Sequence, residues 1–182
     1  MATVVCILLL CGCGSQGNPV DHGISLRNRL QKGNGCSFTA TVTADYGTYL
    51  HTFALQCAAD ATGEIRFQVL APDTISGITG MISGQQGKLT FDEEVLLFSP
   101  LADGLLAPVT APWVLVQTLK GGYIVSGCQL EFGMELSIDD SYAENGLRLD
   151  VQLNDQDLPV SAEIFWEGRR ILSMLIEDFQ IL

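Results

Sequence analysis

Cys36-Ser37-Phe38-Thr39-Ala40-Thr41-Val42-Thr43-Ala44-Asp45 is the stretch that decides the fold, because apolar and polar residues alternate along its whole length. Apolar side chains at every second position are typical of a β-strand with one buried and one solvated face. The alternation resumes over residues 49 to 57, YLHTFALQC, after Tyr46-Gly47. The two runs therefore predict an antiparallel hairpin with a two-residue turn.

Such a turn fixes the register of the hairpin, because the positions of each cross-strand pair then sum to 93. The predicted pairs are Phe38 with Leu55, Ala40 with Phe53, Val42 with His51, and Cys36 with Cys57. Two alternatives follow for the opposed cysteines. They form a disulfide that closes a loop of about 20 residues and contributes on the order of 3 kcal/mol, or they remain two reduced thiols in the core.

Further runs on either side of turn residues extend this hairpin into an antiparallel series of nine or ten strands. The longest alternating run, residues 123 to 138, places Cys128 on its apolar face as a core thiol. The remaining predicted strands are Glu64 to Leu70, Gly77 to Ser83, Lys88 to Asp92, Glu93 to Phe98, Leu147 to Leu153, Val160 to Trp166 and Arg170 to Ile176.

Two helices interrupt the strands. Ser25 is expected to cap a short first helix, which Gly33-Asn34-Gly35 ends. A loop over residues 99 to 112 leads to a second helix from about Ala111 to Lys120, for which Thr110 is the expected cap. This second helix is apolar nearly all round, so it must be covered on more than one side. We expect the open antiparallel sheet to cover it.

The N-terminus carries an apolar run, residues 4 to 10, followed by Leu10-Cys11-Gly12-Cys13 and then by polar residues. The run is too short to span a bilayer as a helix. It resembles a bacterial lipoprotein signal with its lipobox, which implies a signal segment at residues 1 to 12, a lipid-bearing Cys13 and a tether up to residue 23. Residues 24 to 182 then form a single domain. The alternative is a buried apolar strand with incidental cysteines.

Charge narrows the choice of partners. Nine basic and 21 acidic residues give a net charge of −12, which repels nucleic acid and does not favour adsorption to anionic membranes. Membrane attachment must therefore come from the lipid, and a single chain anchors only marginally. We expect Cys13 to carry several acyl chains, such as palmitate, on the extracytoplasmic face of a membrane of the cell envelope.

The series of elements is similar to that of the LolA/LolB-like lipoprotein carriers, a superfamily that includes RseB-like envelope sensors. The segments FQVLAP (67 to 72) and ISGITG (75 to 80) resemble a strand, proline and glycine pattern of these domains. The resemblance implies a mainly β fold, in which a curved antiparallel sheet forms an open half-barrel with a short N-terminal helix and a mid-chain helical lid.

It also implies an apolar cavity for a lipid, an acyl chain or another hydrophobic ligand between sheet and lid. The candidate ligand-binding residues of the lid are Leu101, Leu105, Leu106, Trp113, Val116 and Leu119. In one alternative these residues fill a closed core. In another, the protein is an interaction or sensor module that binds an envelope protein and no small ligand.

Catalytic and metal-binding patterns are scarce in this sequence. His22 falls in the tether and His51 on the apolar face of the first hairpin, and neither has a nucleophile nearby in the sequence. A hydrolase would depend on His51 as its base. Carboxylates cluster at predicted turns, for example at Asp139-Asp140, without the spacing of a calcium loop. We therefore expect no enzyme activity, no cofactor and no bound metal.

Overall fold

The computed structural model describes residues 17–45, 47, 49–84, 86–102, 105–141 and 146–182. The predicted signal segment and Cys13 lie outside these residues. In chain order the elements are α1 (Pro19–Lys32), β1 (Gly35–Asp45), β2 (Leu50–Asp60), β3 (Ile65–Ala71), the 3-10 turn η1 (Asp73–Ile75), β4 (Thr79–Ser83), β5 (Gln86–Phe91), β6 (Glu94–Phe98), β7 (Leu101–Ala102), β8 (Leu105–Leu106), the 3-10 turn η2 (Pro108–Thr110), α2 (Ala111–Gly121), β9 (Tyr123–Gln129), β10 (Met134–Asp139), β11 (Leu147–Leu153), β12 (Pro159–Trp166) and β13 (Arg169–Ile181).

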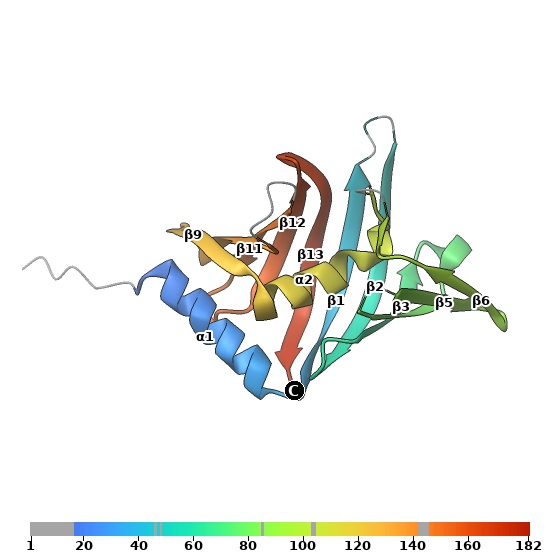
Figure 1. Ribbon diagram of the computed structural model, residues 1–182, viewed down its shortest axis with the longest axis horizontal. Coiled ribbons are helices and arrows are strands. Elements are labelled where there is room, and N and C mark those ends of the chain that lie inside the picture. Colours follow the sequence, from blue (N-terminus) through green and yellow to red (C-terminus); the bar gives the residue numbers. More distant parts are fainter. Residues whose placement is uncertain (1–16, 46, 48, 85, 103–104, 142–145) are drawn as a thin grey trace, which may run out of the picture.

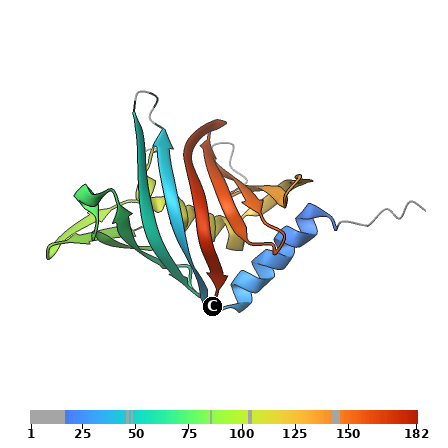
Figure 2. The ribbon, with the colours of Figure 1, turned by 180° about the vertical axis from the view of Figure 1, so that it is seen from behind.

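Eleven of the strands form one antiparallel sheet in the order β6-β5-β4-β3-β2-β1-β13-β12-β11-β10-β9. Its edges, β6 and β9, do not pair with each other, so the sheet stays open. Figure 1 shows the sheet bent strongly around α2, with α1 beside the β9 edge, and Figure 2 shows its outer face from behind. The predicted mainly β, open half-barrel architecture is confirmed.

The first hairpin is present, but its predicted register is wrong by two residues. Asp45 pairs with Leu50 and Phe38 with Cys57, so paired positions sum to 95. The cause lies in the connection, which has four residues instead of two and in which the Asp45 carboxylate accepts a hydrogen bond from the Gly47 N–H at 2.7 Å. A shift by two keeps each side chain on its predicted face, because the side-chain period of a strand is two.

The change of register separates the two cysteines that were expected to face each other. Cys36 lies opposite Ala59, which makes Cys57 its diagonal neighbour. Diagonal residues are about 7–8 Å apart, whereas a disulfide usually joins Cα atoms closer than about 6.8 Å. Both thiols are free and buried, which is the alternative of two reduced core thiols.

Both helices are present, with corrections at their N-terminal ends. Helix α1 begins at Pro19 and not after Ser25, because the Asn18 carboxamide accepts a hydrogen bond from the Val20 N–H and proline occupies the first helical position. The segment expected to be tether up to residue 23 is therefore partly helical. Helix α2 begins at Ala111 as predicted, but the Thr110 hydroxyl donates to the Ala107 carbonyl at 2.6 Å and does not cap the helix.

The long run predicted over residues 123 to 138 is two strands, β9 and β10, joined at a tip of residues 130 to 133. Gly133, with φ at +78°, permits the chain to reverse there. The reversal makes β9 an edge strand, which leaves Cys128 exposed and not in the core. Phe132, placed on the apolar face by the alternation, is 83% exposed at the tip.

The core lies between the concave face of the sheet and the two helices. Leu26 and Leu30 of α1 are buried, as are most apolar residues of α2. From the sheet, the largest fully buried side chains are Val42, Leu55, Ile65, Ile82, Leu136, Ile138, Leu149, Leu153 and Ile164. The more exposed residues, which alternate with the buried ones along each strand, form the outer face of the sheet.

Candidate functional site

The helical lid crosses the concave face of the sheet as α2 (Figure 1). Of the predicted lid residues, Leu106, Val116 and Leu119 are buried in the core, and Trp113 is half-buried against it. The side chains of Leu101 and Leu105 lie outside the described residues. The described lid residues are thus brought together over the sheet, where they fill space as core residues.

Polar contacts fasten the C-terminal half of α2. The Gln117 amide donates to the Gly63 carbonyl at 2.8 Å, and the Lys120 ammonium donates to the Ala61 carbonyl at 2.7 Å, both in the β2–β3 turn. From α1, the Arg27 guanidinium donates to the Leu119 carbonyl at 3.0 Å. These contacts fix one half of the lid to the sheet and to α1.

Trp113, in the first turn of α2, has a polar group that makes no hydrogen bond. Its indole Nε1 is buried and has no hydrogen-bond partner among the described residues. An unpaired buried N–H costs about 1–3 kcal/mol, so such groups are usually satisfied by water or a ligand. The lid therefore offers one hydrogen-bond donor within an apolar setting.

An apolar row runs across the concave face from the sheet centre to the β6 edge. Its members are paired neighbours on successive strands: Phe38, Cys57, Phe67, Gly80, Leu89 and Leu96. Burial decreases along the row, because Phe38 and Phe67 are buried, Leu89 is half-buried and Leu96 is 62% exposed. The apolar core surface thus continues beyond the covered part of the sheet.

Two glycines flatten this part of the concave face. A side chain on Gly80 would overlap the Phe67 ring, and one on Gly87 would overlap the Phe98 ring. The two rings therefore lie against the backbone of the neighbouring strands, as in the aromatic rescue of glycine in sheets. Of the two rings, that of Phe67 is buried, and that of Phe98 is partly exposed and forms part of the floor of this region.

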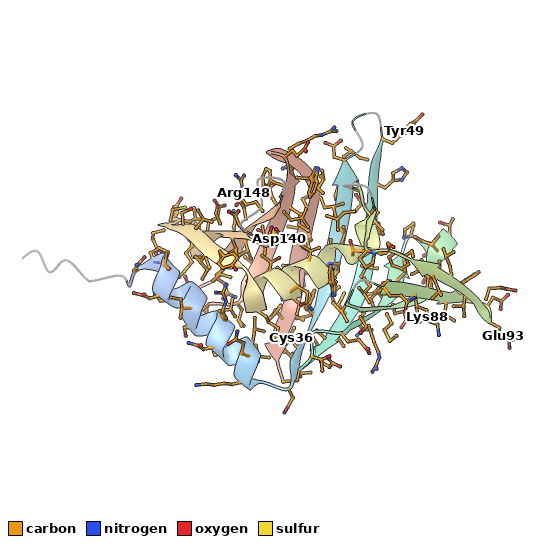
Figure 3. All side chains as sticks on the ribbon, in the orientation of Figure 1. Cys36, Tyr49, Lys88, Glu93, Asp140 and Arg148 are labelled. Carbon is orange, nitrogen blue, oxygen red and sulfur yellow. The ribbon has the colours of Figure 1, made fainter. Side chains whose placement is uncertain are left out.

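The β5–β6 hairpin carries much exposed apolar surface beside this floor. Phe91, Val95, Leu96 and Leu97 are each more than half exposed. In Figure 3 the hairpin projects from the sheet, with Lys88 on β5 and Glu93 at its tip. Exposed apolar clusters of this kind usually mark an interaction site. Sequence reasoning missed it, because the alternation did not show that β6 is an edge strand.

The opposite sheet face has a cavity of about 530 Å³. Its lining includes Ala58, Arg66, Met81 and Lys88, which point away from α2 because they alternate with the buried residues of their strands. Arg66 forms an ion pair with Glu64 at 2.7 Å. This cavity is therefore not the one expected between the sheet and the lid.

The two histidines of the chain lie on different elements. His22 lies on α1, where its Nδ1 is 2.9 Å from an Asp157 carboxylate oxygen, and His51 is exposed beside Tyr49. The described parts of the chain contain no group of three or more His, Cys, Asp or Glu side chains suited to bind a metal. No described helix has the length and apolar character required to cross a membrane.

A scan of protein-family models and a search of curated proteins both find no match. Similar solved structures include a LolA superfamily protein from Nitrosomonas europaea, at 9% identity and a TM-score of 0.45, covering 88% of this chain and 93% of the other. The Mycobacterium tuberculosis lipoprotein LppX matches at 10% identity and a TM-score of 0.43, covering 90% and 96%. A Pseudomonas aeruginosa MucA/MucB complex matches at 15% identity and 0.41, covering 88% of this chain and 56% of the other.

Proposed function

We propose that this protein is a lipid-anchored protein of the cell envelope that binds an acyl chain, or another elongated apolar ligand, on the concave face of its open sheet. The observation that carries the proposal is the apolar row that leaves the covered core at Phe67 and ends at exposed Leu96. The anchor is Cys13, which is proposed from the lipobox-like motif of the sequence.

The physical basis for ligand binding is removal of this apolar surface from water. Burial contributes about 25 cal/mol for each Å² of apolar surface, and half-buried Leu89 and Phe98 together with exposed Leu96 form the surface on which a chain can lie. The indole N–H of Trp113 is a donor suited to an ester carbonyl. The proposed role is non-catalytic.

Two neighbouring residues of β6 provide a matched test. Leu96 and Leu97 are 62% and 60% exposed, but they lie on opposite faces of the sheet. We expect Leu96→Gln to weaken binding of a fatty-acid or phospholipid probe by roughly 10- to 100-fold, the equivalent of burying one leucine, and Leu97→Gln to leave it unchanged. Native mass spectrometry with lipid extraction measures both bound cargo and affinity. Equal effects of the two substitutions would contradict concave-face binding.

A second candidate function is docking of an envelope protein by strand addition to β6. The observation that favours it is that β6 is a free edge with exposed apolar residues on both faces, Val95 and Leu97 on one and Leu96 on the other. Such an edge can accept an extended peptide through main-chain hydrogen bonds. Crosslinking in cells from a reactive group placed at Leu97 would give a discrete protein adduct in this case and none for the lipid-binding function.

A further inference from the structure

The chain between the proposed anchor and the folded domain is short. Five residues, 14 to 18, separate Cys13 from the first residue of α1. Fully extended, five residues span at most ~18 Å, whereas the thirteen residues of β13 span ~43 Å. A lipid on Cys13 therefore holds one end of the molecule close to the bilayer, and that end is the one with the N-terminus of α1.

Contacts at both ends of α1 fix the helix against the sheet. In the first turn, the His22 ring is paired with the Asp157 carboxylate at 2.9 Å, and in the last turn the Arg29 guanidinium donates to the Asp157 carbonyl at 2.8 Å. Pro19 packs against β9, because a Cβ on Gly127 would lie 2.8 Å from the Pro19 Cβ. The point where the tether leaves the domain is thus defined relative to β9.

The β9–β10 tip, residues 130 to 133, begins three residues after Gly127. It is ordered by hydrogen bonds to the Gly133 carbonyl, from the Leu130 N–H at 3.1 Å and from the Gln129 amide at 2.7 Å. Phe132 on this tip is 83% exposed, more than any other large apolar residue of the described chain. Figure 1 and Figure 2 both show the β9–β10 end of the sheet beside the N-terminus of α1.

The tip is suited to an apolar contact more than to an electrostatic one. Its neighbour Glu131 is acidic and the tip has no basic residue, so anionic headgroups do not attract it. Phenylalanine is among the residues that interfacial helices bury at the boundary between headgroups and acyl chains. An anchored lipid chain by itself leaves the orientation of a protein undefined. We infer that Phe132 inserts into the same bilayer as the lipid on Cys13 and so orients the domain, an inference that rests on the proposed anchor.

This orientation has a consequence for the ligand surface. Strands β9 and β6 are opposite edges of the sheet. With β9 at the bilayer, the β5–β6 hairpin and its exposed apolar residues face away from the membrane. The proposed ligand surface is then accessible to a partner or carrier arriving from the aqueous side.

The test compares Phe132→Trp with Tyr49→Trp in the full, lipidated chain. Tyr49 is a matched control, since it is 68% exposed and lies near the end of the β1–β2 hairpin, apart from α1 (Figure 3). Both variants are bound to phosphatidylcholine vesicles whose acyl chains carry bromine, which quenches nearby tryptophan. We expect the fluorescence added by Phe132→Trp to be mostly lost and that added by Tyr49→Trp to be retained.

Flotation of the vesicles separates the two ways in which the experiment can fail. Protein that floats with the vesicles but shows no quenching of Phe132→Trp would overturn the membrane contact and leave the anchor intact. Protein that does not float would overturn the anchor, and with it this inference. Equal quenching of both variants would show that the bilayer does not select the β9–β10 end.

Discussion

At the scale of single residues, three cysteines of the described chain differ in their reactivity. Burial raises the pKa of the Cys36 thiol to about 11. Burial also raises the pKa of the Cys57 thiol, and the nearby Cys36 thiol adds to that increase. Cys128 is exposed on β9. Because the thiolate is the reactive form of cysteine, Cys128 is the thiol that reagents reach.

We therefore predict that, in a protein consisting of residues 17 to 182, which contains three of the six cysteines, a thiol reagent at pH 8 modifies Cys128 alone in the folded state and all three after unfolding without reductant. Intact-mass spectrometry counts the labels, and Cys128→Ser, which should take no label while folded, is the control. The experiment also tests the free state of the Cys36 and Cys57 thiols. A Cys36–Cys57 disulfide would leave the count at one label after unfolding.

At the scale of elements, the packing of the Phe67 ring of β3 against the backbone of β4 depends on Gly80. The Phe67 ring occupies the space that a side chain at position 80 would need. We predict that Gly80→Ala lowers the free energy of unfolding by roughly 1–3 kcal/mol, the usual cost of overpacking. Gly121→Ala is the control, because nothing lies within 4 Å of a Cβ there. Chemical denaturation measures both, and equal stabilities of the two variants would contradict the packed floor.

The bounds of the elements show which features of the fold local sequence patterns can predict. Strand β11 has its predicted bounds, because strict alternation and turn residues delimit it on both sides. The alternation of residues 123 to 138 continues across the tip, so periodicity alone could not reveal the reversal near Gly133. The predicted start of the first helix is too late, because Asn18-Pro19, a cap followed by proline, falls within the predicted tether.

The candidate site was only partly predictable for a related reason. The lid residues could be located because α2 is apolar on nearly all sides, which requires cover. The exposed apolar surface of β6 could not, since its exposure depends on which strand ends the sheet. Strand order is decided by pairing between residues far apart in the sequence, and no local pattern of the hairpin contains that information.

At the scale of the whole molecule, β13 joins two halves of the sheet. It pairs with β1 on one side and β12 on the other, so the strands up to β6 and those from β9 to β12 meet through the last strand of the described chain. Cys36 of β1 pairs with Ile181 of β13, which shows how far apart in the sequence the paired residues are. Such long-range pairing is slow to form, because loop-closure entropy must be overcome first.

We predict that a chain ending at Glu167, which lacks β13, has no cooperative unfolding transition, because β1 and β12 both lose a central partner. Removal of residues 86 to 98, the β5–β6 hairpin at the edge, should lower stability but keep a cooperative transition, since it breaks pairing with β4 alone. Near-UV circular dichroism during thermal unfolding and limited proteolysis distinguish the two. Addition of a synthetic peptide of residues 168 to 182 should restore the fold of the truncated chain. A cooperative transition in that chain without the peptide would mean that the two halves of the sheet fold independently.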